Sequence, residues 1–345
     1  MKIAVCAGGT GGHLFPAVAL TKELEKRGHD VLLVTDRRGA SYCEDIENKD
    51  IVFSLRFSLK NLISFGYKAF LMLIHFLFKW RRNRPEVVVG FGGLLTVVPI
   101  IIAKIYGAKV ILYEQNSIIG KANRYLSKLA DLKLSTFSIG NGWMVQNPPV
   151  RPEFLSRKPF KSKSKIKVLI IGGSQGARSF SKIIPEAMSR LPTKFRKDLE
   201  IIQQESYGDT EALSQRYSKM GINSKIEEFI YDVADVMEQC QLVICRAGAS
   251  TLSELSAIGR PAILIPYPLA TDNHQLLNAQ RYAAKNAAWV IEESPFASEK
   301  LKRILEQIFR NPELLKKAAL NIMNGASANA SEQFAQVIEQ LGASK

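Results

Sequence analysis

Cysteine is scarce in this sequence, and its few copies form no recognisable chemical motif. The 345 residues include four cysteines, and no two of them have the Cys-x-x-Cys spacing of zinc and redox sites. Cys6 and Cys245 stand in apolar runs that we read as buried strands. We therefore expect reduced, structural thiols, as in cytoplasmic proteins, and neither a disulfide framework nor a zinc site.

Three other signatures are missing. There is no Asp-x-Asp motif of the kind that binds a metal ion, no G-x-G-x-x-G loop, and no signal-peptide pattern, because the first apolar segment is only as long as a strand. We expect a cytoplasmic protein with no metal and no cofactor. An NAD-dependent oxidoreductase becomes a weak alternative, for which only Asp36 stands at the right distance to hold a ribose.

Acidic residues are outnumbered, with 32 Asp and Glu against 47 Lys and Arg and a formal charge of +15. This balance indicates an anionic partner, which from charge alone is a nucleic acid, a phospholipid surface or a phosphorylated substrate. The bias is strongest between Arg56 and Arg84, where seven basic residues and no acid occur.

Inside that basic span lies the apolar run 69–78, which at about ten residues is too short to cross a bilayer as a helix. Four apolar residues have the i, i+3, i+4, i+7 spacing of one helical face, namely Leu73, Phe76, Leu77 and Trp80. We predict that this face contacts an anionic membrane surface. The alternative is a core helix with a solvated basic end.

What the sequence does contain is a series of glycine-rich loops, each placed after an apolar run. The first loop, residues 8–13, reads Gly-Gly-Thr-Gly-Gly-His and leads into a helical pattern. Backbone amides and a helix N-terminus suit an oxygen-rich ligand. His13 adds an imidazole, whose unperturbed pKa of about 6.5 suits proton transfer near neutrality. The alternative is a βα turn that uses glycine for close packing.

The same arrangement recurs along the chain. Apolar runs at 87–89 and 110–113 lead into a second glycine loop and into polar residues 114–116, and after a Pro- and Lys-rich linker the run 167–171 leads into Gly172-Gly173-Ser174-Gln175-Gly176. We predict an α/β protein with two Rossmann-like domains, residues 1–155 and 156–345, facing each other across a cleft. A last helix that packs back on the first domain is compatible with this division.

Two motifs of the second half can also be explained as helix caps. After the apolar run 242–245, Ser250 or Thr251 followed by Glu254 has the spacing of a helix capping box, which competes with a ligand role. Gln275 stands where a helix opens, and it can cap backbone groups as readily as it can bind a hydroxyl.

Five segments, taken together and in this order, resemble the MurG family, bacterial transferases that add N-acetylglucosamine to lipid-linked muramyl-pentapeptide in peptidoglycan synthesis. They are residues 8–13 with 15–17, residues 113–116, residues 172–177, residues 246–254, and residues 272–275 with Asn278. The resemblance covers essentially the whole chain. It implies a GT-B fold, UDP-N-acetylglucosamine as donor, lipid I as acceptor, and an inverting, metal-independent displacement by the acceptor 4-hydroxyl.

The resemblance also implies roles for individual residues. His13 would be the catalytic base, with Glu114 as the reserve candidate. The sugar would be reached by Thr10, Gly11, Gly12 and Asn116, with Gln275 on its hydroxyls. The diphosphate would meet Arg151, Ser174, Gln175 and Gly176. Uracil would lie against Ile230, and the nucleotide would be lined by Ala249, Ser250, Thr251, Leu252, Ser253 and Glu254, with Glu254 on the ribose.

Two residues depart from the family pattern on the acceptor side, since Leu94 replaces the usual Tyr and Tyr113 the usual His. The expected location is the cytoplasmic face of the inner membrane, with anionic phospholipid and cell-wall synthesis proteins as partners and no nucleic acid. Remaining alternatives are another GT-B enzyme, such as a UDP-N-acetylglucosamine 2-epimerase or a different lipid glycosyltransferase, and a non-enzymatic basic binding protein.

Overall fold

A computed structural model of the chain describes residues 1–9, 11–55, 62–155, 157–161, 165–173, 176–323 and 328–344. The chain divides into two compact units. Unit 1 comprises Met1–Pro152 together with Asn329–Lys345, and unit 2 comprises Glu153–Ala328. The chain thus leaves unit 1 once and returns to it with its last helix.

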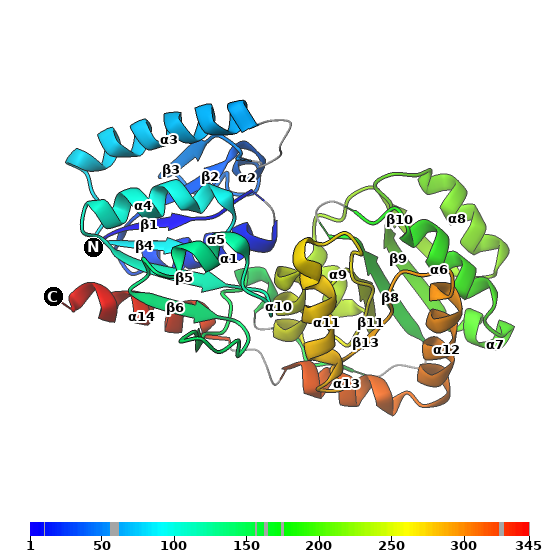
Figure 1. Ribbon diagram of the computed structural model, residues 1–345. Helices are drawn as coiled ribbons and strands as arrows, with labels where there is room; N and C mark the ends of the chain where they lie inside the picture. Colours follow the sequence, from blue (N-terminus) through cyan, green and yellow to red (C-terminus); the bar gives the residue numbers. More distant parts are fainter. Residues whose placement is uncertain are drawn as a thin grey trace. The chain divides into compact units, whose positions relative to one another are not determined.

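Unit 1 is built on a sheet of seven parallel strands in the order β3-β2-β1-β4-β5-β6-β7 (Figure 1). The strands are β1 (Lys2–Cys6), β2 (Asp30–Asp36), β3 (Lys49–Val52), β4 (Val87–Gly90), β5 (Lys109–Glu114), β6 (Leu132–Ser135) and β7 (Met144–Val145). The central strand β1 pairs on both sides, with Ile3 opposite Val31 of β2 and Val87 of β4. Along the chain, strands are therefore added first on one side of β1 (β2 and β3) and then on the other (β4 to β7), so the strand order reverses between β1 and β4.

Helices cover both faces of this sheet, because successive side chains of each buried strand point to opposite sides. In β1, Ile3 and Val5 belong to one apolar cluster with α1 and α14, whereas Ala4 and Cys6 belong to a second with α3 and α4. The helices are α1 (Gly11–Lys26), α2 (Arg37–Ala40), α3 (Leu62–Arg82), α4 (Val97–Ile105), α5 (Lys121–Leu126) and α14 (Ala330–Ala343).

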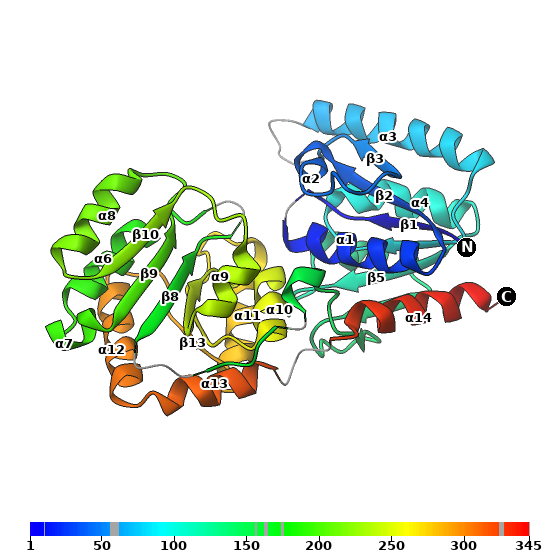
Figure 2. The same cartoon turned by 180° about the vertical axis from the view of Figure 1, so that it is seen from behind.

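The C-terminal helix α14 lies beside α1 (Figure 2). Its Phe334 is fully buried, with the ring centroid 5.2 Å from that of Tyr113 and 6.0 Å from that of Phe91. Its Glu339 pairs with Arg27 at 3.2 Å and with His29 at 2.9 Å. These contacts make α14 part of the core of unit 1, although unit 2 separates it from the rest of that core along the chain.

The prediction for the amphipathic segment is wrong about which face is exposed. Helix α3 has 21 residues and by length and composition is long enough to cross a membrane, so it extends well beyond the apolar run 69–78. Phe76 and Trp80, which we expected at a lipid surface, are 0% and 1% exposed and pack against the sheet. Lys79, which belongs to the basic span 56–84, pairs with Asp50 of β3 at 2.9 Å.

Unit 2 repeats the architecture with a sheet of six parallel strands in the order β10-β9-β8-β11-β12-β13. The strands are β8 (Ile166–Ile171), β9 (Leu199–Gln204), β10 (Asn223–Glu227), β11 (Leu242–Cys245), β12 (Ala262–Leu264) and β13 (Ala288–Val290). The order of growth reverses between β8 and β11, as it does between β1 and β4. Both sheets therefore have the Rossmann strand order that the repeated strand and loop pattern predicts.

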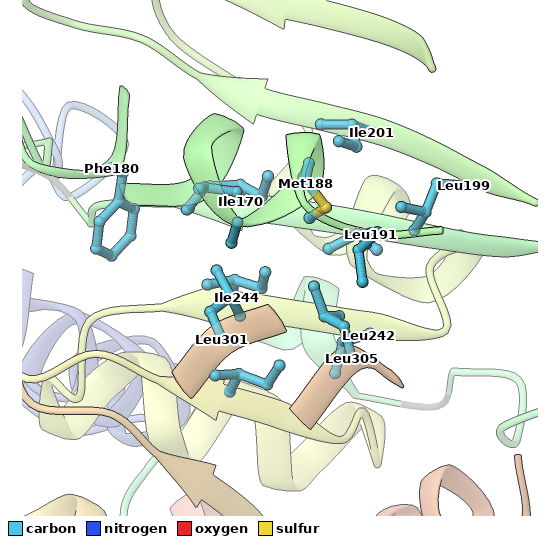
Figure 3. Close-up of a cluster of buried hydrophobic side chains, with 14 of the residues drawn as sticks. Ile170, Phe180, Met188, Leu191, Leu199, Ile201, Leu242, Ile244, Leu301 and Leu305 are labelled. Atoms are coloured by element: carbon cyan, nitrogen blue, oxygen red, sulfur yellow. The ribbon is translucent and has the colours of Figure 1, made fainter. Parts of the chain in front are cut away.

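One apolar cluster of unit 2 joins the sheet to helices from distant parts of the chain. Ile170 and Ile244 of the central strands lie against Phe180 of α6 and Leu301 of α12 (Figure 3). The helices are α6 (Phe180–Ser189), α7 (Thr193–Lys197), α8 (Thr210–Lys219), α9 (Val233–Gln239), α10 (Ala249–Ile258), α11 (His274–Ala283), α12 (Ala297–Arg310) and α13 (Glu313–Met323).

The four cysteines are free and buried, as predicted for structural thiols. Burial raises the pKa of the Cys6 and Cys245 thiols far above their ordinary value. Both side chains therefore stay protonated at neutral pH, and they act as small apolar groups inside the sheets.

The orientation of α3 generates a stability prediction. Phe76→Ala should lower the free energy of unfolding by about 3–5 kcal/mol, because it leaves a cavity beside Trp80 in the core. The matched control is Phe78→Ala on the same helix, where the ring is 70% exposed and the loss should stay within about 0.5 kcal/mol. Urea unfolding of both variants measures the difference, and equal losses would contradict the orientation described.

Candidate active site

The first glycine loop of unit 1 lies where β1 ends, at the point where the sheet reverses its order. In open parallel sheets ligands bind at such points, outside the carboxyl ends of the strands. Helix α1 begins at Gly11, so Gly11, Gly12 and His13 form its first turn, and His13 is partly exposed. Thr10 lies outside the described residues.

Asp36, the one residue that fitted a dinucleotide site, has a structural role. Its carboxylate caps α2 by accepting from the backbone N–H of Arg38 at 3.0 Å and of Gly39 at 3.3 Å, and it pairs with the Arg38 guanidinium at 2.6 Å. Burial opposes ionisation, but these bonds outweigh it and hold the pKa of Asp36 below its usual range. A carboxylate engaged in this way is poorly placed to hold a ribose.

The second glycine loop, after β4, lies beside His13 of α1 and Asn123 of α5. Gly92 has φ +89°, and a Cβ built on it would lie 3.5 Å from His13 Nε2 and 3.4 Å from Asn123 Nδ2. His13 and the buried Asn123 thus both lie next to the position that a Cβ at residue 92 would occupy. A side chain at this position would be strained and would touch both groups.

Glu114, at the end of β5, is nearly fully buried and acts as an anchor for the loop that follows it. Its carboxylate accepts from the backbone N–H of Asn116 at 3.1 Å and of Gly120 at 2.9 Å, and from Asn116 Nδ2 at 3.2 Å and Asn123 Nδ2 at 2.9 Å. Four donors occupy its oxygens. The arrangement therefore fixes the backbone that carries Asn116, and it favours a structural over a catalytic role for Glu114.

The two departures from the family pattern both fall on side chains that pack inward. Tyr113 is fully buried, with its hydroxyl bonded to Thr136 at 2.8 Å and to the Gln146 carbonyl at 3.2 Å. Leu94 packs against the apolar cluster under α3 and α4. In this chain both replacements serve the core of unit 1.

Arg151, predicted to meet the diphosphate, lies beside the first turns of α1. Its guanidinium carbon stacks over the ring of Phe15 at 4.4 Å from the centroid. Phe15 in turn meets Tyr42 edge-on at 5.5 Å. The side chain is partly exposed, so the stacking orients a cation without removing it from solvent.

The glycine loop after β8 lies at the point where the sheet of unit 2 reverses its order. Gly176 N–H donates to the Gly173 carbonyl at 2.9 Å, which turns the chain toward α6. A Cβ on Gly176 would lie 2.8 Å from the ring of Tyr207, so the loop also approaches the segment after β9 closely. Ser174 and Gln175 lie outside the described residues.

The loop after β11 leads into α10, and the capping-box interpretation of this segment is wrong. The residue that caps α10 is Gly248, so Ser250 and Thr251 are already helical and Glu254 is too far along to complete the box. Glu254 is 7% exposed, and Ser253 bonds the Ala249 carbonyl at 2.9 Å. Ala249 and Thr251 are partly exposed, whereas Ser250 and Leu252 are buried.

The remaining predicted residues lie on neighbouring loops of unit 2. Ile230, between β10 and α9, is 5% exposed. Gln275 is in the first turn of α11, and its side-chain oxygen accepts from the Tyr267 backbone N–H at 2.9 Å, which ties the helix to the loop after β12 and does not cap α11 itself. Asn278 is fully buried and donates to the Ala247 carbonyl at 3.4 Å, which ties α11 to the loop before α10.

The residues that sequence reasoning missed are buried polar side chains that hold these loops. Asn123 gave no signal, because a single Asn in a short helix is unremarkable. Glu205 also went unnoticed, although its carboxylate accepts from the backbone N–H of Tyr207 at 3.0 Å and of Gly208 at 2.8 Å beside the second unit's glycine loop. Within the described ranges no group of three or more His, Cys, Asp or Glu could hold a metal ion.

Comparisons with known proteins agree across both units. Residues 3–134 match the glycosyltransferase family 28 N-terminal domain, and residues 167–341 match the glycosyltransferase family 28 C-terminal domain. A UDP-N-acetylglucosamine–N-acetylmuramyl-(pentapeptide) pyrophosphoryl-undecaprenol N-acetylglucosamine transferase from Sinorhizobium medicae is 38% identical over 98% of this chain and 95% of its own length.

Solved structures give the same result. The crystal structure of MurG from Acinetobacter baumannii has a TM-score of 0.82 and 25% identity, and the match covers 98% of this chain and 99% of that one. A UDP-N-acetylglucosamine 2-epimerase shares the fold at a TM-score of 0.68, with 11% identity over 97% of this chain and 94% of that one. The matched domains and the identity over almost the full length place this chain in glycosyltransferase family 28, as a member of the MurG family.

Proposed function

We propose that the protein transfers N-acetylglucosamine from UDP-N-acetylglucosamine to the 4-hydroxyl of undecaprenyl-pyrophosphoryl-MurNAc-pentapeptide, which converts lipid I into lipid II. The observation that carries this proposal is the 38% identity that extends over 98% of the chain to a transferase named for this reaction. The 2-epimerase alternative rests on a fold shared at 11% identity. Incubation with radiolabelled UDP-N-acetylglucosamine and lipid I tests the proposal, because only the transferase labels the lipid.

In the proposed mechanism unit 2 supplies most of the groups that bind the donor, and unit 1 adds Arg151. Glu254 holds the ribose, Ile230 lies against uracil, and Gln275 binds sugar hydroxyls. The diphosphate meets the glycine loop 172–176 and Arg151. As the sugar–phosphate bond breaks, negative charge grows on the departing UDP, and backbone amides, a helix N-terminus and a guanidinium stabilise that charge.

The acceptor binds to unit 1 beside the first glycine loop, with Asn116 directed at the transferred sugar. His13 takes the proton from the incoming 4-hydroxyl, which attacks the anomeric carbon in one inverting displacement and gives a β-1,4 linkage. Support for His13 over Glu114 comes from geometry. His13 is partly exposed in the first turn of α1, whereas four donors already occupy Glu114.

We assign membrane contact to the outward face of α3, in place of the face that sequence analysis selected. Its exposed apolar residues are Leu62, Ile63, Tyr67, Phe70 and Phe78, which are between 53% and 91% exposed. Arg81 and Arg82 lie in the last turn of this helix, and Arg84 follows it. An apolar face with a basic end suits peripheral attachment to anionic phospholipid at the cytoplasmic face of the membrane that holds lipid I.

His13→Ala should lower kcat by about two to four orders of magnitude, because general base catalysis contributes about that much. UDP affinity should stay within a few fold, since the donor is bound by unit 2. Single-turnover transfer and calorimetry with UDP measure the two quantities. Wild-type kcat in His13→Ala would remove His13 from the chemistry.

Glu254→Ala should weaken UDP binding by about ten- to a hundredfold, because a carboxylate that accepts from ribose hydroxyls makes charge-assisted bonds worth about 1.5–3 kcal/mol. Calorimetry and thermal melting on the same sample separate ligand binding from stability. If Tm falls while the folded protein binds UDP normally, Glu254 is structural.

Ile63→Ser combined with Phe70→Ser should release the protein from vesicles containing acidic phospholipid, while transfer to a short-chain, water-soluble acceptor continues. The control is Leu269→Ser in unit 2, where the side chain is 79% exposed but lies far along the chain from α3. Wild-type binding should weaken as salt increases. Unchanged sedimentation of the double variant with vesicles would rule out this face.

A further inference from the structure

A buried guanidinium in unit 2 joins four loops at the carboxyl edge of the sheet. Arg246 follows β11, and its Nη1 pairs with Glu293 Oε1 at 2.5 Å. The same nitrogen donates to the carbonyls of Ile265 at 3.0 Å and Pro266 at 3.2 Å, while Nη2 donates to Ser179 Oγ at 3.2 Å. The side chain of Arg246 is 9% exposed, and the carboxylate of Glu293 compensates its buried charge.

Ser179 completes this cluster in an unexpected way. It occupies the N-cap position of α6, where a Ser hydroxyl ordinarily accepts from the helix backbone, but it makes no such capping bond. Its hydroxyl instead donates to Glu293 Oε1 at 2.5 Å and accepts from Arg246. Two rings, Phe180 at 4.8 Å and Tyr267 at 5.4 Å from the guanidinium carbon, stack on it.

The four loops follow β8, β11, β12 and β13, which are neighbours in the sheet. Three of them lead to groups that the proposed function places on the donor. Ser179 starts α6 behind the glycine loop, Arg246 leads into α10, and Tyr267 donates its backbone N–H to the Gln275 side chain at 2.9 Å. A shift of the guanidinium would therefore move all three groups together.

We propose that Ser179, Arg246 and Glu293 form a latch that positions the donor-binding loops of unit 2. Glu293 and Ser179 are then positioning residues for UDP-N-acetylglucosamine, although neither belongs to a segment that carries the family resemblance. Glu293 neutralises Arg246, and Ser179 connects both to α6. The planar fork of arginine is needed, because one lysine could not reach the carbonyls and the hydroxyl in fixed directions. This inference rests on the proposed function.

The test compares Glu293→Gln and Ser179→Ala with a matched control, Glu292→Gln, which removes the same charge from an exposed neighbour. We expect the Kd for UDP and the KM for UDP-N-acetylglucosamine to rise about tenfold in the latch variants, as a lost bond to a charged group implies. At saturating donor, kcat should change less than about twofold, because the latch does not act on His13. The double variant should lose less than the product of the single losses, since both act through Arg246.

A second measurement keeps the latch separate from the proposed function. Hydrogen exchange of the backbone amide of Tyr267, which is bonded to Gln275, should accelerate in Glu293→Gln and stay unchanged in Glu292→Gln whether or not the protein binds UDP. Failure of the wild type to bind UDP would count against the proposed function, and the exchange rates would still decide whether the latch holds the loop. UDP affinity equal in Glu293→Gln and Glu292→Gln would overturn the proposal, even if exchange is faster, because the cluster would then hold only the fold.

Discussion

The site in each unit depends on one constraint, the parallel direction of all strands in a sheet. Parallel strands place their carboxyl ends at the same edge, and a sheet that grows outward from a central pair leaves diverging loops there. In unit 1 these loops follow β1 and β4, and they carry His13 and Gly92. In unit 2 they follow β8 and β11, and they carry the glycine loop and the start of α10.

Loops at the carboxyl ends of the strands have no ladder of backbone hydrogen bonds to hold them. In this protein buried charged side chains hold these loops. Asp36 fixes the turn beside the first glycine loop, and Glu114 fixes the loop that carries Asn116. Arg246 holds the carbonyls of residues 265 and 266. Each charge is buried and each is compensated by several partners, so the loops gain a defined shape without an unpaired charge.

The central strands and the glycine loops could be predicted from the sequence, because strands buried on both faces read as continuous apolar runs. The edge strands β3, β7 and β10 could not, since they are short or polar and partly exposed. The orientation of α3 was also beyond the sequence. Its apolar residues surround the helix, and only packing decides that Phe76 is buried while Phe78 is exposed.

Site residues divide in the same way. The glycine loops and His13 could be predicted, because a glycine-rich loop that precedes a helix and ends in a histidine is a rare combination. The true cap of α10 is Gly248, and a glycine cap carries no side-chain signal, so the Ser and Glu spacing suggested a box that does not exist. Partners such as Asn123 for Glu114 depend on tertiary contacts, which no local pattern records.

The return of α14 to unit 1 has a consequence for synthesis on the ribosome. Phe334 packs against the rings of Phe91 and Tyr113, so the side of the first core that α14 covers stays open until this helix has been made. Unit 2, which lies wholly between the two parts of unit 1, can close its own core earlier. The second unit of the chain is thus the first that can be completed, and the nascent first unit exposes apolar surface throughout that interval, when chaperones would bind it.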